Sequence, residues 1–131
     1  MRFDVSSIPA GSTIDSATLT LCPTRVPDDT RTYNVHRVTA SWVETTLTWS
    51  NQPTVGGTAS DSATTPASVA CMTWTLAGDV QAWVDGTANN GWRVSDSVES
   101  QGTKYWTEYR TREDTGVPSE QPRLDVTYTA P

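Results

Sequence analysis

The chain has few charged residues and no long apolar run. Only 18% of its 131 residues are charged, and nine basic against fifteen acidic residues give a net charge of −6. A nucleic acid or an anionic membrane surface would repel this chain, because no cluster of lysine and arginine offsets its charge. No apolar run approaches the length of a membrane span. We therefore expect neither nucleic-acid binding nor membrane insertion.

Histidine and cysteine are also scarce. His36 is the single histidine and has no evident partner for a nucleophilic triad, and with Cys22 and Cys71 it falls short of a zinc site. A cysteine pair in a Thr-rich, Lys-poor chain is typical of a disulfide, and the alternative is two free thiols. A Cys22–Cys71 bond would stabilise the fold by roughly 4 kcal/mol by restricting the unfolded chain.

No cofactor is expected from the acidic residues. Asp28, Asp29 and Asp85 lie in predicted loops and could contribute ligands to a structural calcium ion, as in other extracellular β-sandwich modules. Their spacing matches no calcium-binding loop, and solvated loop acids are the simpler interpretation.

Helix-forming residues are also sparse, and strand-forming residues dominate. Thr and Ser supply much of the polarity, and six Trp and four Tyr stand against one Phe. A Thr methyl packs on a pleated surface while its hydroxyl faces water, and the large rings can anchor a small core. We predict an all-β fold, an antiparallel jelly-roll-like β-sandwich with one short helix. At 14.2 kDa the chain suits a single domain over residues 1–131.

Alternation of apolar residues and turn signals place the elements. Strands are expected at 2–5, 17–22, 33–38, 69–75, 92–94, 104–111 and 122–128, with an extended stretch over 42–49. Loops are expected over 23–29, 54–68 and 112–121. One helical turn is expected over 79–84, with Asp79 as its cap and Gly86 just past its end.

The aromatic residues divide into expected core and expected surface. Trp49 shares an apolar face with Leu47 and is predicted to be core, and so are Trp83 and Trp92. Tyr33 is also expected in the core. Trp42 and Trp74 could belong to either group.

The strand expected at 104–111 carries the strongest candidates for ligand contacts. Its Tyr109 is expected in the core, so Trp106 points to the opposite side together with Lys104 and Arg110. Arg93 would join them if the two strands are neighbours. An exposed indole stacks on the apolar face of a pyranose, while cationic side chains hydrogen-bond its hydroxyls. The predicted ligand-binding residues are therefore Trp106, Arg110, Lys104 and Arg93; packing of Trp106 under the 54–68 loop is the alternative.

Several short motifs occur in order along the chain. They are Arg2-Phe3-Asp4-Val5, Trp42-x-Glu44, Leu47-Thr48-Trp49-x-Asn51-x-Pro53, Asp79-Val80-Gln81-x-Trp83, Asn89-Asn90-Gly91-Trp92, Tyr109-x-Thr111-Arg112-Glu113 and Pro122-Arg123-Leu124-x-Val126-x-Tyr128. This ordered set spans nearly the whole chain and resembles the DNRLRE domain family, which overlaps carbohydrate-binding module family 96. The resemblance implies a secreted bacterial or archaeal β-sandwich, attached to larger surface proteins or to polysaccharide-degrading enzymes.

The sequence departs from that family at its start. Members usually carry further strands before the segment that matches Arg2–Val5, and this sequence begins there. A sheet without those strands has an open edge that could accept a strand from a neighbouring chain. The leading expectation is a non-catalytic extracellular module that binds a polysaccharide. The alternative is a structural or adhesive subunit of a surface assembly or filament, joined by strand donation at the open N-terminal edge.

Hydrolysis is the weakest interpretation. Two carboxylates could cleave a glycosidic bond, and Glu44, Asp79 and Glu113 lie in the matching motifs. Each has a simpler role, because Asp79 can cap the helix, Glu113 can pair with Arg112 or Arg123, and Glu44 can accept backbone N–H groups. We therefore expect no catalytic residue.

Overall fold

A computed structural model describes residues 1–98 and 106–131 as antiparallel sheets with one short helix. One sheet has the order β5-β1-β8 and the other β4-β3-β6, and a two-stranded sheet pairs β2 with β7. The strands are β1 (Thr13–Leu21), β2 (Pro23–Arg25), β3 (Thr32–Arg37), β4 (Asp61–Thr64), β5 (Met72–Thr75), β6 (Trp92–Asp96), β7 (Glu108–Tyr109) and β8 (Arg123–Thr129). The predicted all-β sandwich is confirmed.

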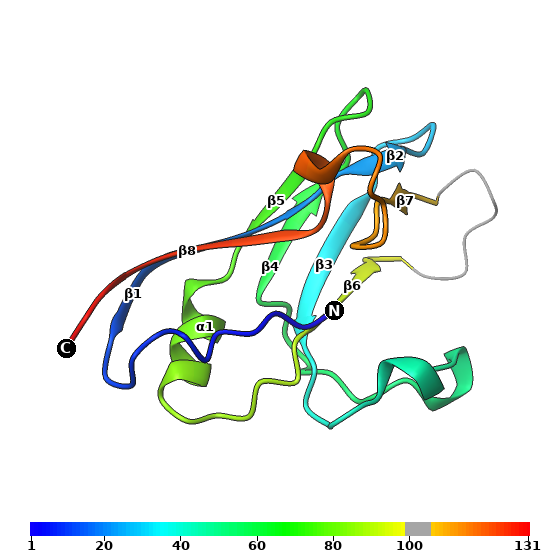
Figure 1. Cartoon of the computed structure of the whole chain (residues 1–131). Helices are drawn as coiled ribbons and strands as arrows, with labels where there is room; N and C mark the ends of the chain where they lie inside the picture. The colour runs from blue at the N-terminus through cyan, green and yellow to red at the C-terminus, as the bar shows by residue number, and fades with distance from the viewer. Residues whose placement is uncertain (99–105) are drawn as a thin grey trace.

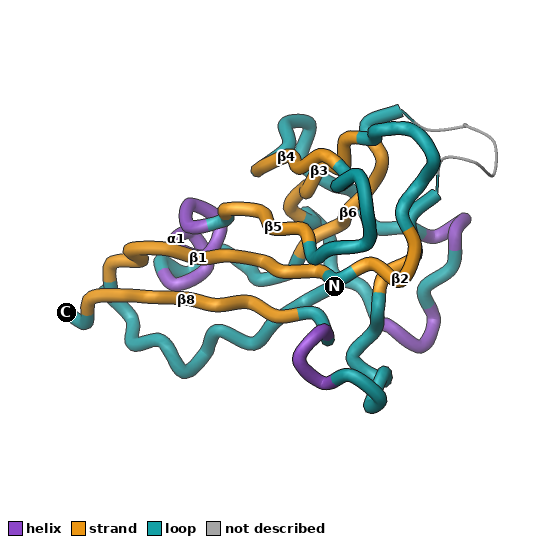
Figure 2. The backbone as a smooth tube through the Cα atoms, turned by 90° about the horizontal axis from the view of Figure 1, so that it is seen from above, coloured by secondary structure: helices purple, strands orange, loops and turns teal. Residues whose placement is uncertain are grey.

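Strand β1 forms the middle of its sheet because its apolar residues alternate. Ala17, Leu19 and Leu21 are buried, and Leu19 lies opposite Trp74 of β5 and Leu124 of β8. Figure 2 shows β1 and β8 running side by side, with β5 and α1 along the other side of β1. This face of β1 therefore covers one side of the core.

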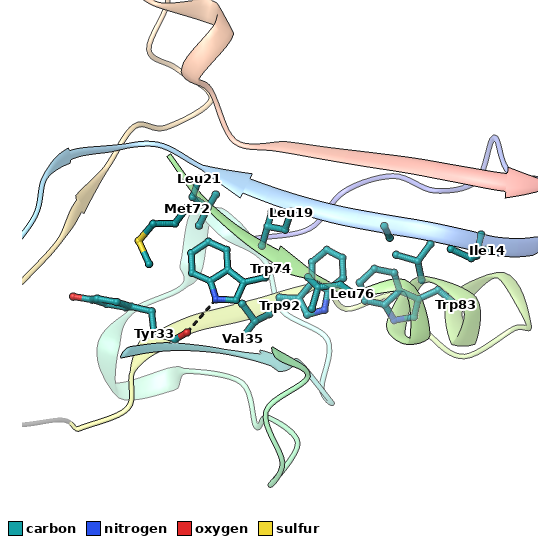
Figure 3. Close-up of a cluster of buried hydrophobic side chains, with 12 residues drawn as sticks. Ile14, Leu19, Leu21, Tyr33, Val35, Met72, Trp74, Leu76, Trp83 and Trp92 are labelled. Atoms are coloured by element: carbon teal, nitrogen blue, oxygen red, sulfur yellow. Dashed lines mark hydrogen bonds between the residues drawn. The ribbon is translucent and has the colours of Figure 1, made fainter. Parts of the chain in front are cut away.

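The core is built around two buried indoles (Figure 3). Trp74 is 1% exposed and its Nε1 donates to the Tyr33 carbonyl at 3.0 Å. Trp92 is fully buried, its Nε1 donates to Asp79 Oδ2 at 2.6 Å, and its ring centroid lies 4.4 Å from that of Trp83. A buried indole needs such an acceptor for its N–H group. The predicted core positions of Trp83, Trp92 and Tyr33 are confirmed, and Trp74 joins them.

The helix α1 (Ala77–Val84) lies where it was expected. Val80 and Trp83 are its buried apolar residues, and Gly86 follows its end with a φ of 103°, a conformation that suits glycine. Asp79 does not cap the helix, contrary to the prediction. The cap position falls at Leu76, and Asp79 lies in the first turn with its carboxylate bonded to Trp92.

Several predicted element boundaries are wrong. Residues 2–5 form no strand, and the expected extended stretch over 42–49 contains the short 3-10 helix η1 (Glu44–Thr46) and the start of η2 (Trp49–Asn51). The expected loops over 23–29, 54–68 and 112–121 contain β2, β4 and the 3-10 helix η4 (Pro118–Glu120), respectively. Of the strand expected at 104–111, only β7 is present in the described part, and residues 99–105 lie outside it.

The predicted disulfide is present between Cys22 and Cys71. It joins the residue after β1 to the residue before β5, two strands that also pair in the sheet. No helix among the described residues is long and apolar enough to cross a membrane.

Candidate binding site

An open hollow of about 650 Å³ lies beside β6 and β7. We call it the first hollow. Its aromatic lining comes from distant parts of the chain and comprises Tyr33, Trp42, Trp49, Trp92, Trp106 and Tyr109. A mostly apolar concavity of this size with a few polar groups is typical of sites that bind small molecules or single units of a polymer.

Three of the four predicted ligand-binding residues line this hollow. Trp106 is 46% exposed, and Arg93 of β6 and Arg110, which follows β7, are half-buried in its wall. The fourth, Lys104, lies outside the described residues. The structure therefore brings Trp106, Arg93 and Arg110 together, although β6 and β7 belong to different sheets.

Arg110 is held rigidly. Its Nε donates to Glu120 at 2.6 Å, one of its terminal nitrogens donates to Asp114 at 2.6 Å, and its backbone N–H donates to the Cys22 carbonyl at 3.0 Å. The hydrogen bonds to Asp114 and Glu120 raise the pKa of Arg110 above its usual value. The guanidinium thus forms a fixed part of the wall whose charge is balanced by two carboxylates.

Arg93 differs from Arg110 because no carboxylate in the described part of the chain forms an ion pair with its guanidinium. Its Nε is buried without a hydrogen-bond acceptor there, and no described carboxylate forms an ion pair with it. Asp96, which also lines the hollow, is bound by Arg31 through two hydrogen bonds of 2.8 Å. A buried donor without an acceptor costs free energy, so Arg93 has an unsatisfied polar atom behind the wall of the hollow.

Trp106 is oriented by a neighbouring strand. The guanidinium carbon of Arg25 in β2 lies 5.0 Å from the centroid of the Trp106 ring, within the range of a cation–π contact. Since β2 pairs with β7, the two-stranded sheet places both partners of this contact. The indole therefore stands at the rim of the hollow in a defined position and is still half exposed.

Trp49 is the residue that sequence reasoning placed wrongly. It was predicted to be core, yet its side chain is 82% exposed and lines the first hollow, and Leu47 beside it is 42% exposed. The cause is local. Thr48 and Asn51 bond reciprocally as a capping box, which turns the chain into η2 instead of a strand. The Thr48-x-x-Asn51 spacing is the signal that could have revealed this turn.

The segment over residues 39–54, which we call the 39–54 loop, is clamped at its base. Thr39 and Thr54 join through a backbone hydrogen bond of 2.9 Å and a hydroxyl contact of 2.7 Å, and Val38 forms a bridge with Val55. The loop projects from the end of β3 and carries Trp49 (Figure 1). Closed ends and internal hydrogen bonds give Trp49 a defined position despite its exposure.

A second hollow of about 560 Å³ adjoins the first. The two share five lining residues, namely Met1, Trp42, Tyr109, Arg110 and Pro122. The second hollow has a more polar wall, in which Arg112 contacts Glu44 at 3.1 Å and Glu113 at 2.7 Å. These contacts to Glu113 and Glu44 raise the pKa of Arg112.

The acids considered for catalysis all have partners. Asp79 is buried between the Trp92 indole and Arg37, whose guanidinium lies 3.8 Å away, while Glu44 and Glu113 both contact Arg112. Glu113 thus pairs with arginine as expected, and Glu44 contacts a side chain where a backbone partner was expected. Across residues 1–98 and 106–131, no group of three or more His, Cys, Asp or Glu side chains is arranged to hold a metal ion.

Comparison with known families identifies one match. The profile of carbohydrate-binding module family 96 matches residues 1–128, which include every described residue that lines the two hollows. No curated protein matches the chain significantly, and no solved structure does so either.

Proposed function

We propose that this chain, which belongs to carbohydrate-binding module family 96, binds a polysaccharide through the first hollow. The contacts assigned to the sugar are the indoles of Trp106 and Trp49 and the guanidinium groups of Arg93 and Arg110. Lys104 keeps its predicted place in this set and lies outside the described residues.

One observation carries the proposal: two exposed indoles line the same concavity as the half-buried side chains of Arg93 and Arg110. An indole face contacts the apolar face of a pyranose ring, and a guanidinium donates to ring hydroxyls. The clamped 39–54 loop holds Trp49 and the contact with Arg25 holds Trp106, so both indoles have defined positions before a sugar arrives. Such preorganisation reduces the conformational cost of binding.

The same family membership favours a binding role over catalysis. Carbohydrate-binding modules recognise glycans without cleaving them, and the acids Asp79, Glu44 and Glu113 are engaged with other side chains. A disulfide such as Cys22–Cys71 persists in an oxidising compartment. We therefore propose a secreted or cell-surface module that brings a larger protein to a glycan, and the family resemblance implies a bacterial source.

Retention of the protein in native gels that contain a polysaccharide tests the proposal. The gels would contain cellulose, xylan, mannan or a polyuronate. We expect one of them to slow the wild-type protein, and Trp106→Ala to restore its mobility. Tyr128→Ala is the matched control, because Tyr128 is an aromatic residue of similar exposure (41%) that lines neither hollow. Unchanged mobility of the wild-type protein across all four gels would refute the proposal.

A second function, assembly by strand donation, has one specific observation in its favour. Among the described residues β6 is an edge strand, and Met1 forms both hydrogen bonds of an antiparallel pair with Trp92, at 2.7 and 2.8 Å. By alternation, the backbone groups of Val94 and Asp96 point to the same open edge. A strand from another copy that continues this ladder would make the chain a structural or adhesive subunit.

Light scattering separates the two functions. A concentration-dependent assembly that Val94→Pro dissolves would support strand donation, because proline removes an edge N–H donor. A monomer at every concentration would exclude it and leave glycan binding as the function.

A further inference from the structure

We infer that the two hollows form one continuous groove, so that the chain binds the interior of a linear polysaccharide and the second hollow is a separate sugar subsite. This inference rests on the proposed function. It extends the site beyond the predicted ligand-binding residues, of which only Arg110 lines the second hollow, and it assigns Glu44 and Arg112 to that subsite.

The shared wall supports continuity between the two hollows. Five residues line both of them, so the two spaces adjoin across a single layer of shared residues. The side chains of this wall are fixed. Trp42 Nε1 donates to the Asn90 carbonyl at 2.8 Å, and Arg110 is bound by two carboxylates. Tyr109 packs edge-on against Tyr33, with ring centroids 6.1 Å apart. A ligand that crosses this wall would therefore meet a preformed surface.

Exposed side chains line each hollow outside the shared wall. Trp49, which is 82% exposed, stands on the first hollow, and the exposed side chains of Glu44 and Arg112 stand on the second. A site that captures a chain end needs a closed pocket around the terminal sugar. Two open hollows that share a wall suit a polymer whose bound part occupies both hollows and whose two ends extend beyond them.

The chemistry of the two hollows differs in a way that suits adjacent sugar units. The first carries the exposed indoles of Trp49 and Trp106, whereas the second adds a carboxylate and a guanidinium held 3.1 Å apart. A sugar hydroxyl both donates and accepts hydrogen bonds, so Glu44 could accept from one hydroxyl while Arg112 donates to the next. Because this ion pair is solvent-exposed, it contributes little to stability, and its variants should fold.

Oligosaccharide ladders test the inference. The ladder would be prepared from whichever of cellulose, xylan, mannan or polyuronate the wild-type protein retains, and would run from the disaccharide to the octasaccharide. Calorimetry should show affinity rising with length to a plateau. Arg112→Ala should weaken the longest oligosaccharide roughly tenfold, the effect of one lost charge-assisted hydrogen bond, and leave the shortest one that binds unchanged. Glu44→Gln should act in the same direction.

Two controls make the outcome decisive. Arg123→Ala removes an exposed arginine that lies outside both hollows and pairs with Asp125, and should change no affinity. Trp106→Ala should weaken every length. Equal effects of Arg112→Ala at all lengths, no effect at any length, or loss of binding when the chain end is chemically blocked would overturn the inference and leave the proposed function intact. Failure of the wild-type protein to bind any of the four glycans would overturn both.

Discussion

The indole Nε1 of Trp92 donates a 2.6 Å hydrogen bond to Asp79, a residue in the first turn of α1. This bond joins the helix to the centre of the core, because Trp92 is fully buried and begins β6. It also satisfies the one polar atom of that indole. The position of β6, and with it that of Arg93 in the first hollow, depends in part on this contact.

Asp79→Ala should destabilise the protein by about 1–3 kcal/mol, because it leaves the Trp92 N–H buried without an acceptor. Asp79→Asn retains an acceptor oxygen and should cost less. Urea denaturation followed by tryptophan fluorescence measures both. Asp85→Ala is the control, since Asp85 is exposed, and should stay within about 0.5 kcal/mol of wild type. Equal stability of Asp79→Ala and wild type would show that this bond contributes nothing.

Trp49→Ala should leave stability within about 0.5 kcal/mol of wild type, because the side chain is 82% exposed, yet it should weaken glycan binding. Trp74→Ala, which empties a buried site, should cost about 3–5 kcal/mol. Thermal unfolding and gel retention together separate the two effects. If Trp49→Ala unfolds the protein as readily as Trp74→Ala does, the exposed placement of Trp49 is wrong.

Acid should destabilise the protein in part through Asp96. Burial raises the pKa of this carboxyl, but hydrogen bonds from Arg31 and from the Val98 backbone outweigh it and leave the pKa below the ordinary value of 3.8. A depressed pKa means that the stabilisation is present above the unfolded value and is lost as the pH falls through the folded value. Asp96→Asn should therefore lose less stability than wild type between about pH 5 and pH 2. Parallel melting curves for the two proteins over that range would contradict this assignment.

Reduction of the Cys22–Cys71 disulfide should lower stability by about 2–4 kcal/mol, because the closed loop restricts the unfolded chain. Scanning calorimetry with and without dithiothreitol measures the change. A Cys22→Ser/Cys71→Ser variant should melt like the reduced wild-type protein and be insensitive to the reagent. A melting temperature of the wild-type protein that does not respond to complete reduction would count against a stabilising role.

Gly91→Ala should be costly for two reasons. Gly91 has a φ of 75°, and a Cβ there would collide with the Met1 carbonyl and with Arg2. We expect a loss of more than about 1 kcal/mol and faster amide exchange at Trp92, whose N–H donates to Met1. Gly86→Ala is the matched control, since Gly86 also has a positive φ, of 103°, and a Cβ there meets nothing within 4 Å. Similar stability of the two variants would show that the N-terminal residues do not pack on β6 in solution.

Local signals in the sequence were sufficient to predict several of the strands and the helix. Alternation of Leu19 and Leu21 identified β1, and Gly86 located the end of α1. The strand β4 was missed because its sequence, Asp-Ser-Ala-Thr, has no apolar alternation. It pairs with β3 through its backbone, and Asp61 Oδ2 accepts a 2.6 Å hydrogen bond from the Thr75 N–H of β5. Neither the strand pairing nor this hydrogen bond requires an alternating pattern of apolar residues, so the sequence gives no sign of either.

The candidate site was only partly predictable for a related reason. Trp106 could be assigned to the surface from its position relative to Tyr109, but the hollow brings together residues from both ends of the chain, from Met1 to Pro122. Leu47 and Trp49 show the spacing of a strand, and the reciprocal bonds of Thr48 and Asn51 produce a turn from the same spacing. Local periodicity could not decide between these outcomes, and it favoured the wrong one.

The clamped base of the 39–54 loop gives this module a region that can diverge without loss of the fold. Thr39 and Thr54 hold the two ends together, and no residue of η1 or η2 is buried. Because the entropy cost of closing a loop grows slowly with its length, insertions and replacements within η1 and η2 should be tolerated. Evolution, or a protein engineer, could thus exchange the segment that carries Trp49 for another and retarget the groove while the two sheets stay unchanged.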